Sequence, residues 1–458
     1  MTPSSLTVRS PYDQAVVAEI PYQNDAQLQA VAQQSASTWQ AWRRVPLSDR
    51  ISFVRAGLER LRSQAETIAR DVTRQMGKPL AQAQGEVNTM LARAEQAITD
   101  APAALADDDL SSPGFVRRIR HEPLGVVLNM AAWNYPLLIP INVIVPALLA
   151  GNTVILKHSA RTPLTGEAFA AAFGELEIPG LVQHVVMTHA QTETLIAQPE
   201  ISYVAFTGSV EGGRSVYRAA AQRLLDAGLE LGGKDPAYVA ADADLQRAID
   251  NLVDGACYNA GQSCCAVERV YVHRSLYDDF VEGCRAKINE YVLGDPLLDS
   301  TTMGPLTLRD TLRVMDEQIA DAQSRGARVL AGGQRWAAEP AQFYAPTLLA
   351  DVPNDALAMQ AETFGPLLPI AAVESDEDAV AKMNDSRLGL TASIWSTDSE
   401  RCERLASEIN AGTIFRNRCD YIDPQLPWTG WNESGIGSTL SRYGFIHLTR
   451  RKAIHFRD

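Results

Sequence analysis

Hydrophobic and polar positions follow two different spacings along the chain. Over residues 25–100, apolar side chains recur three or four positions apart, as at Leu28, Val31 and Trp39, which is typical of amphipathic helices. We expect one helix capped by Asp25, a second over about 48–73 that residues 75–79 end, and a third over about 81–99. Residues 101–113 are small, acidic and contain Pro and Ser, so they predict a surface connection.

After residue 115 the helical spacing gives way to short runs rich in β-branched residues, which predict strands. The first three runs are each followed by a helix-like segment, the third of which extends to Leu225. Strands that alternate with helices imply parallel pairing in a doubly wound α/β sheet, and the pattern restarts as a second α/β unit after about residue 231. The predicted strands are residues 126–130, 153–157, 203–207, 269–273 and 391–395.

The most apolar stretch, Leu137 to Ala150, predicts a buried helix that begins near Pro136. The stretch is too short to span a bilayer and is interrupted by Pro140, Asn142 and Pro146. At the N-terminus no charged segment precedes an apolar core, so we expect no signal peptide.

Length and charge narrow the classes of function. A chain of 458 residues is too long for one simple core, so we expect two or three domains. The net charge of −14 argues against sequence-independent binding to nucleic acid or to an anionic membrane. The six cysteines form no disulfide framework and no paired CxxC motif, which fits a reducing cytoplasm. Because HExxH and GxSxG motifs are absent, we expect neither a catalytic metal nor a serine hydrolase.

Cys264 and Glu230 carry the clearest candidate chemistry. Cys264 lies among small residues in the run 261–269, where backbone N–H groups could lower the pKa of a thiol and bind an oxyanion. Glu230 follows an apolar run and precedes two glycines, where partial burial would raise its pKa toward that of a general base. A thiol and a carboxylate together can form and hydrolyse a thioester. Each alone also fits an ordinary role, as a buried cysteine or as a capping or surface glutamate.

Two further features are weaker when taken alone. The Asn134 amide is a fixed neutral donor suited to an oxyanion, but an Asn just before Pro136 also suits a turn. Gly208 and Ser209 follow a strand and open a helix, where backbone N–H groups can face a phosphate. The GxGxxG fingerprint of dinucleotide-binding folds is not present.

Several short motifs occur in a fixed order with compatible spacing. They are Gly77–Pro79, Trp133–Leu137, Gly151–Lys157, Thr162–Leu164, Phe206–Ser209, Leu229–Lys234, Gly261–Cys264, Glu362–Pro366 and Ser434–Gly437. Together they resemble the motifs of the NAD(P)-dependent aldehyde dehydrogenases. The resemblance covers nearly the whole chain, and the co-occurrence of the motifs makes it specific.

The resemblance implies an aldehyde dehydrogenase-like α/β fold in three parts. A Rossmann-type cofactor domain would comprise residues 1–104 and 124–231, and an α/β catalytic domain would comprise residues 232–440. A β oligomerisation arm would comprise residues 105–123, with a strand over 115–122, and residues 441–458. Members of the family are usually dimers or tetramers, so we expect a homodimer or homotetramer.

The resemblance also implies the oxidation of an aldehyde to its carboxylic acid with NAD(P)+. Cys264 would attack the aldehyde, the Asn134 side chain and the Cys264 backbone N–H would hold the oxyanion, and hydride would leave to the nicotinamide. Glu230 would then activate the water that hydrolyses the thioester. The residues that match the family's cofactor-binding positions are Trp133, Lys157, Gly208, Ser209, Glu362 and Phe364.

One departure from the family concerns the cofactor. In NAD-preferring members an acid three residues after the lysine commonly accepts both ribose hydroxyls, whereas this chain has Ala160, flanked by Ser159 and Arg161. Without that acid there is no repulsion of a 2′-phosphate, so we expect NADP to be used alongside NAD.

A second departure concerns the expected substrate tunnel. The family's Pro-Phe-Gly-Gly segment is here residues 427–430, its following lysine is Asn432, and two arginines lie nearby, Arg416 and Arg418. Either arginine could bind the carboxylate of a semialdehyde or could pair with a neighbouring Asp420 or Asp423. The aromatic residues expected at the tunnel mouth, unless they fill the core or an interface, are Tyr135, Tyr258, Tyr421 and Trp428.

Three alternatives stay open. In a CoA-acylating relative, CoA would take the acyl group, but a base for water such as Glu230 would then have no use. A non-catalytic structural relative would have no need to keep Cys264, Glu230 and Asn134 together. An esterase run by Cys264 is a plausible side activity, since it uses the same groups.

Overall fold

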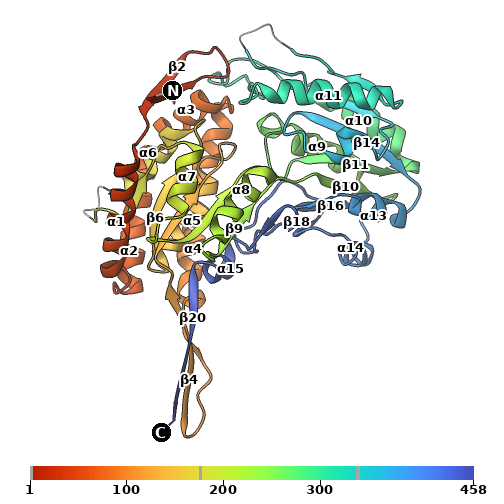
Figure 1. The fold of residues 1–458 in the computed structure, drawn as a ribbon. Helices are drawn as coiled ribbons and strands as arrows, with labels where there is room; N and C mark the ends of the chain where they lie inside the picture. Colours follow the sequence, from red (N-terminus) through yellow and green to blue (C-terminus); the bar gives the residue numbers. More distant parts are fainter. Residues whose placement is uncertain (1–3, 175–177, 337–340, 458) are drawn as a thin grey trace.

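The chain folds into two α/β lobes that lie side by side, with a narrow ribbon of strands extending from the first lobe (Figure 1). The computed structural model describes residues 4–174, 178–336 and 341–457. The first lobe holds the red to yellow-green part of the chain, and the second holds most of the green to blue part.

The first lobe is built on a six-stranded sheet with the order β19-β9-β8-β5-β6-β7. All neighbours pair in parallel except β19, which pairs antiparallel with β9. Every residue of β5 is buried, as expected for a parallel strand covered on both faces. The strands are β5 (Val126–Met130), β6 (Thr153–Lys157), β7 (Val182–His184), β8 (Ile201–Thr207), β9 (Ala227–Glu230) and β19 (Gly435–Ile436).

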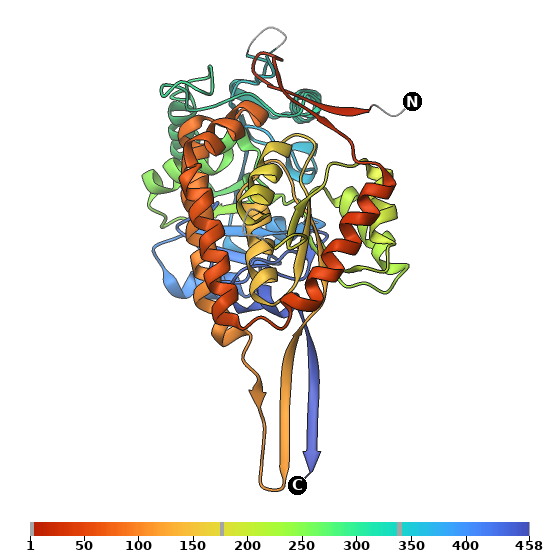
Figure 2. The same ribbon diagram turned by 90° about the vertical axis from the view of Figure 1, so that its left-hand side faces the viewer.

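Helices cover both faces of this sheet, which confirms the doubly wound α/β prediction. One hydrophobic cluster packs α1, α7 and α8 against one face, and a second packs α2 to α6 against the other (Figure 2). The helices are α1 (Asp25–Trp42), α2 (Leu47–Ser63), α3 (Ala65–Met76), α4 (Leu80–Ala104), α5 (Leu138–Leu149), α6 (Pro163–Gly174), α7 (His189–Ile196) and α8 (Val210–Ala221).

Several predicted boundaries were wrong. Asn24, not Asp25, caps α1, because its side chain accepts from the Gln27 N–H in a capping box. The helix predicted over 48–73 is two helices that meet at Gln64, and α4 continues to Ala104 through residues predicted as a surface connection. The helix α8 ends at Ala221 rather than Leu225.

Other predictions agree with the structure. The strands over 126–130, 153–157 and 391–395 match, and those at 203 and 269 begin two residues earlier. Gly77 ends α3 with a φ of 85°, a left-handed value that glycine adopts without strain. The apolar stretch forms α5, every residue of which is buried.

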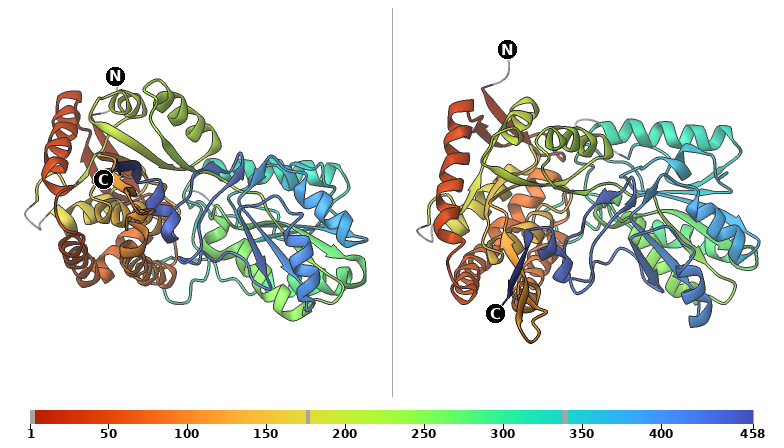
Figure 3. Two further views of the ribbon diagram at one scale, coloured as in Figure 1. Left: turned by 90° about the horizontal axis from the view of Figure 1, so that it is seen from below. Right: turned by 60° about the horizontal axis from the view of Figure 1, so that its bottom comes forward.

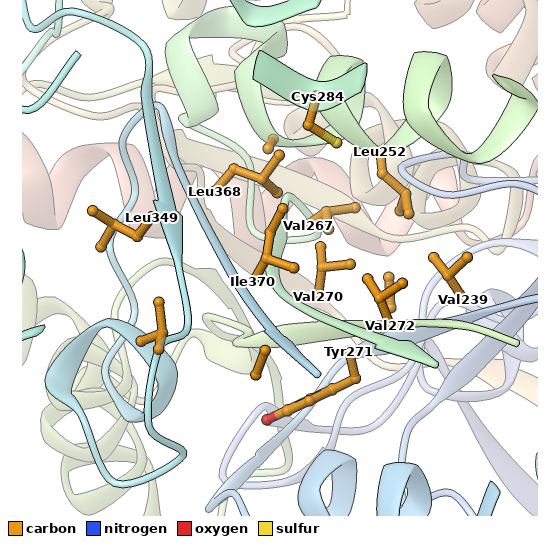
Figure 4. Packing of buried hydrophobic residues seen from close by; sticks show 14 of the residues in the cluster. Val239, Leu252, Val267, Val270, Tyr271, Val272, Cys284, Leu349, Leu368 and Ile370 are labelled. Atoms are coloured by element: carbon orange, nitrogen blue, oxygen red, sulfur yellow. The ribbon is translucent and has the colours of Figure 1, made fainter. Parts of the chain in front are cut away.

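The second lobe contains a seven-stranded sheet with the order β12-β13-β14-β11-β10-β16-β17. The neighbours are parallel except β12 and β13, and the residues labelled in Figure 4 pack around the central strands. The strands are β10 (Asp235–Val239), β11 (Val267–His273), β12 (Arg328–Ala331), β13 (Thr347–Ala350), β14 (Leu367–Val373), β16 (Thr391–Trp395) and β17 (Thr413–Arg416). The helices are α9 (Leu245–Cys257), η1 (Tyr258–Gly261), η2 (Arg274–Leu276), α10 (Tyr277–Ile288), α11 (Asp310–Ser324), α12 (Leu357–Gln360), α13 (Asp376–Asn384) and α14 (Ser399–Ala406).

The ribbon is a three-stranded antiparallel sheet that projects away from both lobes (Figures 2 and 3). β20 pairs with β4 over nine residues, and β3 pairs with β4 near its middle. Before β20, the helix α15 (Ser441–Ile446) packs on the first lobe and buries Phe445. The ribbon strands are β3 (Asp108–Asp109), β4 (Phe115–Pro123) and β20 (Thr449–Arg457); two further small sheets pair β1 (Ser5–Arg9) with β2 (Val16–Pro21) and β15 (Leu388–Gly389) with β18 (Trp431–Asn432). The predicted domain boundaries stay a prediction.

Candidate active site

Cys264 lies in a tight turn between α9 and β11. The preceding 3-10 turn, η1, places Asn259 and Ala260 at φ values of 53° and 56°, an uncommon conformation for residues with a side chain. Asn259 donates to the backbone oxygens of both Gln262 and Asn134, which ties the turn to the first lobe. The Cys264 side chain is half-buried and lines a cavity of about 310 Å³. This turn therefore presents a thiol at the junction of the lobes.

Glu230 ends β9 and lines the same cavity as Cys264. The Thr207 hydroxyl donates to one carboxylate oxygen at 2.9 Å, and the Thr439 hydroxyl donates to the other. Burial raises the pKa of Glu230, while these hydrogen bonds and the charge of Arg93 act in the opposite direction. The structure thus brings together a thiol and a carboxyl group with a raised pKa, as required for making and hydrolysing a thioester.

Asn134 is buried in the segment that precedes α5, 3% exposed. Its backbone oxygen accepts from Lys78 Nζ at 2.8 Å, and Lys78 forms a buried ion pair with Glu86. Glu86 in turn accepts from the Leu137 N–H at 2.8 Å, so the pair holds both ends of the segment. The described residues that line the 310 Å³ cavity include the neighbouring Tyr135 but not Asn134.

We predict that Lys78→Met will lower the free energy of unfolding by about 3–5 kcal/mol, because it leaves the Glu86 carboxylate buried without its partner. Thermal and urea denaturation monitored by circular dichroism measure the loss. The matched control is Arg70→Met, which breaks a pair with Glu66 that is 51% and 75% exposed and should cost less than about 1 kcal/mol. Equal losses in the two variants would contradict the prediction.

A second cleft, of about 630 Å³, opens at the carboxyl ends of β5, β6 and β8. Crevices at this end of parallel strands are the usual ligand sites of doubly wound sheets. Ser209 caps α8, and a Cβ at Gly208 would lie 2.7 Å from the Phe206 ring, so the α8 N-terminus is held close to the cleft wall. Six predicted cofactor residues line the cleft: Trp133, Lys157, Ser159, Ala160, Gly208 and Ser209.

The charges in this cleft suit a phosphorylated ligand. Within the described part of the chain, the Lys157 ammonium has no recorded hydrogen bond or ion pair, and burial lowers its pKa. Arg161 also lines the cleft, and Glu193 contributes a carboxylate that accepts from the Ser215 hydroxyl. The cationic side chains at this end are available to an anionic group, and no acid stands at position 160.

Glu362 and Phe364 lie in the second lobe, outside the residues that line the cleft. Glu362 Oε1 is buried and finds no hydrogen-bond partner among the described residues. Burial and the nearby Glu268 raise the pKa of Glu362 to about 8. Phe364 packs edge-on against Trp133 at 5.5 Å between ring centres, which links the two sets of residues. An unpartnered carboxylate oxygen beside a dinucleotide-sized cleft fits a ribose hydroxyl.

Glu268 is a positioning residue that the sequence interpretation missed. It accepts from Lys234 Nζ at 2.7 Å, from the Thr363 N–H and from the Phe364 N–H at 2.9 Å. These contacts hold the segment that carries Glu362 and Phe364. The available signal was an adjacent pair of charged residues, Glu268 and Arg269, inside the buried strand β11.

The predicted substrate residues separate into two groups. Tyr135, Tyr258 and Trp428 line the cavity with Tyr421. Arg418 does not line it, because its guanidinium lies over the Tyr421 ring, 3.3 Å from the centroid. Arg416 donates to the Ser396 and Thr397 carbonyls. Across the described residues, no ion pair joins either arginine to Asp420 or Asp423.

The cavity also contains charged groups that were not predicted. Arg93 and Asp254 line it, as does Asp420, whose carboxylate accepts from the Ser263 hydroxyl and from the Cys265 thiol at 3.0 Å. Burial raises the pKa of Asp420 to about 7. A hydrogen bond with Cys264 and burial raise the pKa of the Cys265 thiol well above its usual range, so Cys265 is a poor nucleophile beside Cys264.

The described residues contain neither a cluster of metal ligands nor a helix able to span a membrane. No group of three or more His, Cys, Asp and Glu side chains there is arranged to hold a metal ion. None of the helices there has the length and apolar character needed to cross a membrane.

Comparison with known proteins gives a consistent picture. The family model described as "Aldehyde dehydrogenase family" matches residues 1–454. A succinate-semialdehyde dehydrogenase [NADP(+)] of Deinococcus radiodurans is 33% identical over 446 residues, which cover 97% of this chain and 93% of the relative. A 3,6-anhydro-alpha-L-galactose dehydrogenase of Streptomyces coelicolor is 32% identical, over 99% of this chain and 93% of the relative. The solved structure of lactaldehyde dehydrogenase from Escherichia coli superposes with a TM-score of 0.96 at 30% identity, over 100% of this chain and 96% of that one.

Proposed function

The chain belongs to the aldehyde dehydrogenase family and oxidises an aldehyde to its carboxylic acid with NAD(P)+, and we propose that Cys264 and Glu230 carry the reaction. The observation that supports this assignment is that both side chains line one cavity, which adjoins the cofactor cleft at Thr207, a residue in both walls. Formation of NAD(P)H with a panel of aldehydes tests the function, and a panel without any turnover would contradict it.

The proposed reaction begins with the Cys264 thiolate. It attacks the aldehyde carbon, and the oxygen of the resulting thiohemiacetal takes the charge. The Cys264 backbone N–H and the Asn134 side chain are the expected donors to that oxygen. NAD(P)+, when bound, accepts the hydride, and the product on the protein is a thioester of Cys264. Donors held by buried contacts suit this step because they need no reorganisation as the charge develops.

Glu230 then serves as the general base for hydrolysis. Its raised pKa makes it a stronger base than an exposed glutamate, because burial disfavours the carboxylate. It removes a proton from the water that attacks the thioester, and the carboxylic acid leaves as Cys264 is regenerated. In the structure Thr207 and Thr439 each donate to one carboxylate oxygen of Glu230, and each oxygen keeps a second lone pair that can accept the proton of the attacking water.

We predict that the enzyme uses NADP as well as NAD. The kcat/KM with NAD should exceed that with NADP by less than about a thousandfold, which corresponds to a difference of about 4 kcal/mol in transition-state stabilisation. The physical reason is that Lys157 and Arg161 line the cleft while position 160 is an alanine. In Ala160→Asp the new carboxylate would repel a 2′-phosphate, so kcat/KM for NADP should fall about 10- to 100-fold. The same variant assayed with NAD is the control and should change less than about threefold. A wild-type NAD preference above a thousandfold would contradict the prediction.

We further propose a homodimer or homotetramer built through the ribbon of β4 and β20. The ribbon has no core of its own, and it exposes 61% of Phe456 and 58% of Leu110. On the division proposed from sequence, residues 105–123 and 441–458 form this arm. Light scattering of the intact chain and of a variant lacking residues 449–458 measures the assembly.

All six cysteines are free, which supports a reducing cytoplasmic location.

A further inference from the structure

Arg93 is a buried arginine in the wall of the catalytic cavity. It lies on α4 and is 6% exposed, and its side chain faces both the 310 Å³ cavity and a small neighbouring pocket. Its Nε has no hydrogen-bond partner, and within the described residues no hydrogen bond or ion pair of its guanidinium is recorded. Burial lowers the pKa of Arg93, and the charges of Cys265, Glu230 and Glu86 act in the opposite direction.

Such an arrangement is unfavourable unless a ligand completes it. A guanidinium keeps its charge at neutral pH, and a charge removed from water needs a partner that also accepts its N–H groups. The most buried cations elsewhere in the structure have such partners: Lys78 pairs with Glu86, and Lys234 pairs with Glu268. Arg93 differs from them in opening onto the space where substrate must lie.

Arg93 supplies a fixed positive charge to the wall of the catalytic cavity. Burial raises the pKa of Glu230, Asp254 and Asp420, so these acids are shifted toward their neutral forms, whereas arginine is not neutralised. Much of the remaining wall is apolar or aromatic, with Leu138, Ile139, Tyr135, Tyr258 and Trp428. A wall of this kind accommodates a short aliphatic chain between two polar ends.

We propose that Arg93 binds the carboxylate of the substrate and makes the enzyme selective for short aldehydes that carry an acid group at the other end. This inference rests on the proposed function, because it requires the aldehyde at Cys264. The planar fork of a guanidinium matches two carboxylate oxygens, and Arg93 and Cys264 line the same small cavity. Neither arginine considered from the sequence lines the cavity: Arg418 lies over the Tyr421 ring, and Arg416 donates to backbone carbonyls.

The test compares two aldehydes of equal length, succinate semialdehyde and butanal, in the wild type, Arg93→Gln, Arg93→Lys and Arg418→Gln. We expect the wild type to prefer the semialdehyde at least about 30-fold in kcat/KM. Arg93→Gln should remove that preference mainly through KM, with butanal changed less than about threefold, and Arg93→Lys should keep part of it.

Three outcomes would overturn the proposal. An equal loss of kcat for both aldehydes in Arg93→Gln would mean that Arg93 acts on the charge of Glu230. Loss of the preference in Arg418→Gln alone would assign recognition to that residue. A wild-type preference for 3-aminopropanal over both aldehydes would assign the cavity to a cationic substrate through Asp254 and Asp420. Failure to oxidise any aldehyde would instead count against the proposed function.

A measurement on the wild type alone covers the case in which the Arg93 variants do not fold. Succinate and butyrate are compared as competitive inhibitors of butanal oxidation. Each has one carboxylate that can lie near Cys264, and only succinate has a second that can reach Arg93. We expect succinate to inhibit at least about tenfold more tightly, and equal inhibition would contradict the proposal.

Discussion

Cys264→Ala is expected to lower the rate of aldehyde oxidation about ten-thousandfold or more. Without the sulfur no thiohemiacetal forms, and removal of the nucleophile in covalent catalysis abolishes nearly the whole advantage of the site. The measurement is NAD(P)H absorbance with saturating aldehyde. NAD(P)H binding, followed by fluorescence, should be unchanged within about threefold, which shows that the cleft is intact.

The matched control is Cys265→Ser. Its thiol is buried, 3% exposed, and donates to Asp420, so it does not substitute for its neighbour. We expect this variant to keep the rate within about tenfold. Iodoacetamide should inactivate the wild type by modifying Cys264 first, as mass spectrometry of the peptides would show. Activity that survives in Cys264→Ala but is lost in Cys265→Ser would show that Cys265, not Cys264, is the nucleophile.

Glu230→Gln is expected to stop the reaction after the first turnover. Glutamine preserves the shape of the side chain but removes no proton from water, so the thioester should accumulate. Stopped-flow absorbance should show a burst of about one NAD(P)H per active site, followed by steady turnover about 10²- to 10⁴-fold slower than in the wild type. A steady rate equal to that of the wild type, or the absence of any burst, would reject Glu230 as the base.

The same residue predicts the acid limb of the pH profile. The base works only when deprotonated, and burial raises the pKa of Glu230, so kcat of the wild type should fall as the pH drops through a value above that of an exposed glutamate. Asp420, with a pKa of about 7, lies in the same cavity and serves as the comparison. The limb should persist in Asp420→Asn and disappear in Glu230→Gln. A requirement for CoA in the steady turnover of the wild type would favour acyl transfer to CoA instead of hydrolysis.

The sequence could predict much of the fold because the central strands are strongly patterned. A strand buried on both faces, such as β5 or β16, appears as a short run of mostly β-branched and apolar residues, with Asn129 and Ser393 as the polar exceptions. Helix ends were less accurate. Asn24 and Asp25 are both good capping residues, and the choice depends on the contact with Gln27. The break at Gln64 between α2 and α3 has no proline or glycine to mark it.

Long-range contacts explain what the sequence could not show in the candidate site. Arg93 lies in an ordinary amphipathic helix, where an arginine normally faces solvent, and only the packing of α4 against the cavity distinguishes it. Asp420 has a φ of 45° in an irregular segment that no periodicity describes. The partners of Glu230 come from β8 and from residue 439, more than two hundred positions away in the second case.

The short pairing of β19 with β9 has a consequence for biosynthesis. The strand that carries Glu230 receives its edge partner, and Glu230 its second hydroxyl donor, from residues 435–439. Cys264 and the residues that line the cofactor cleft are therefore synthesised well before the last residue that holds the base. A chain that ends before residue 435 would carry Cys264 but would lack both the edge strand beside β9 and the Thr439 hydroxyl that holds Glu230.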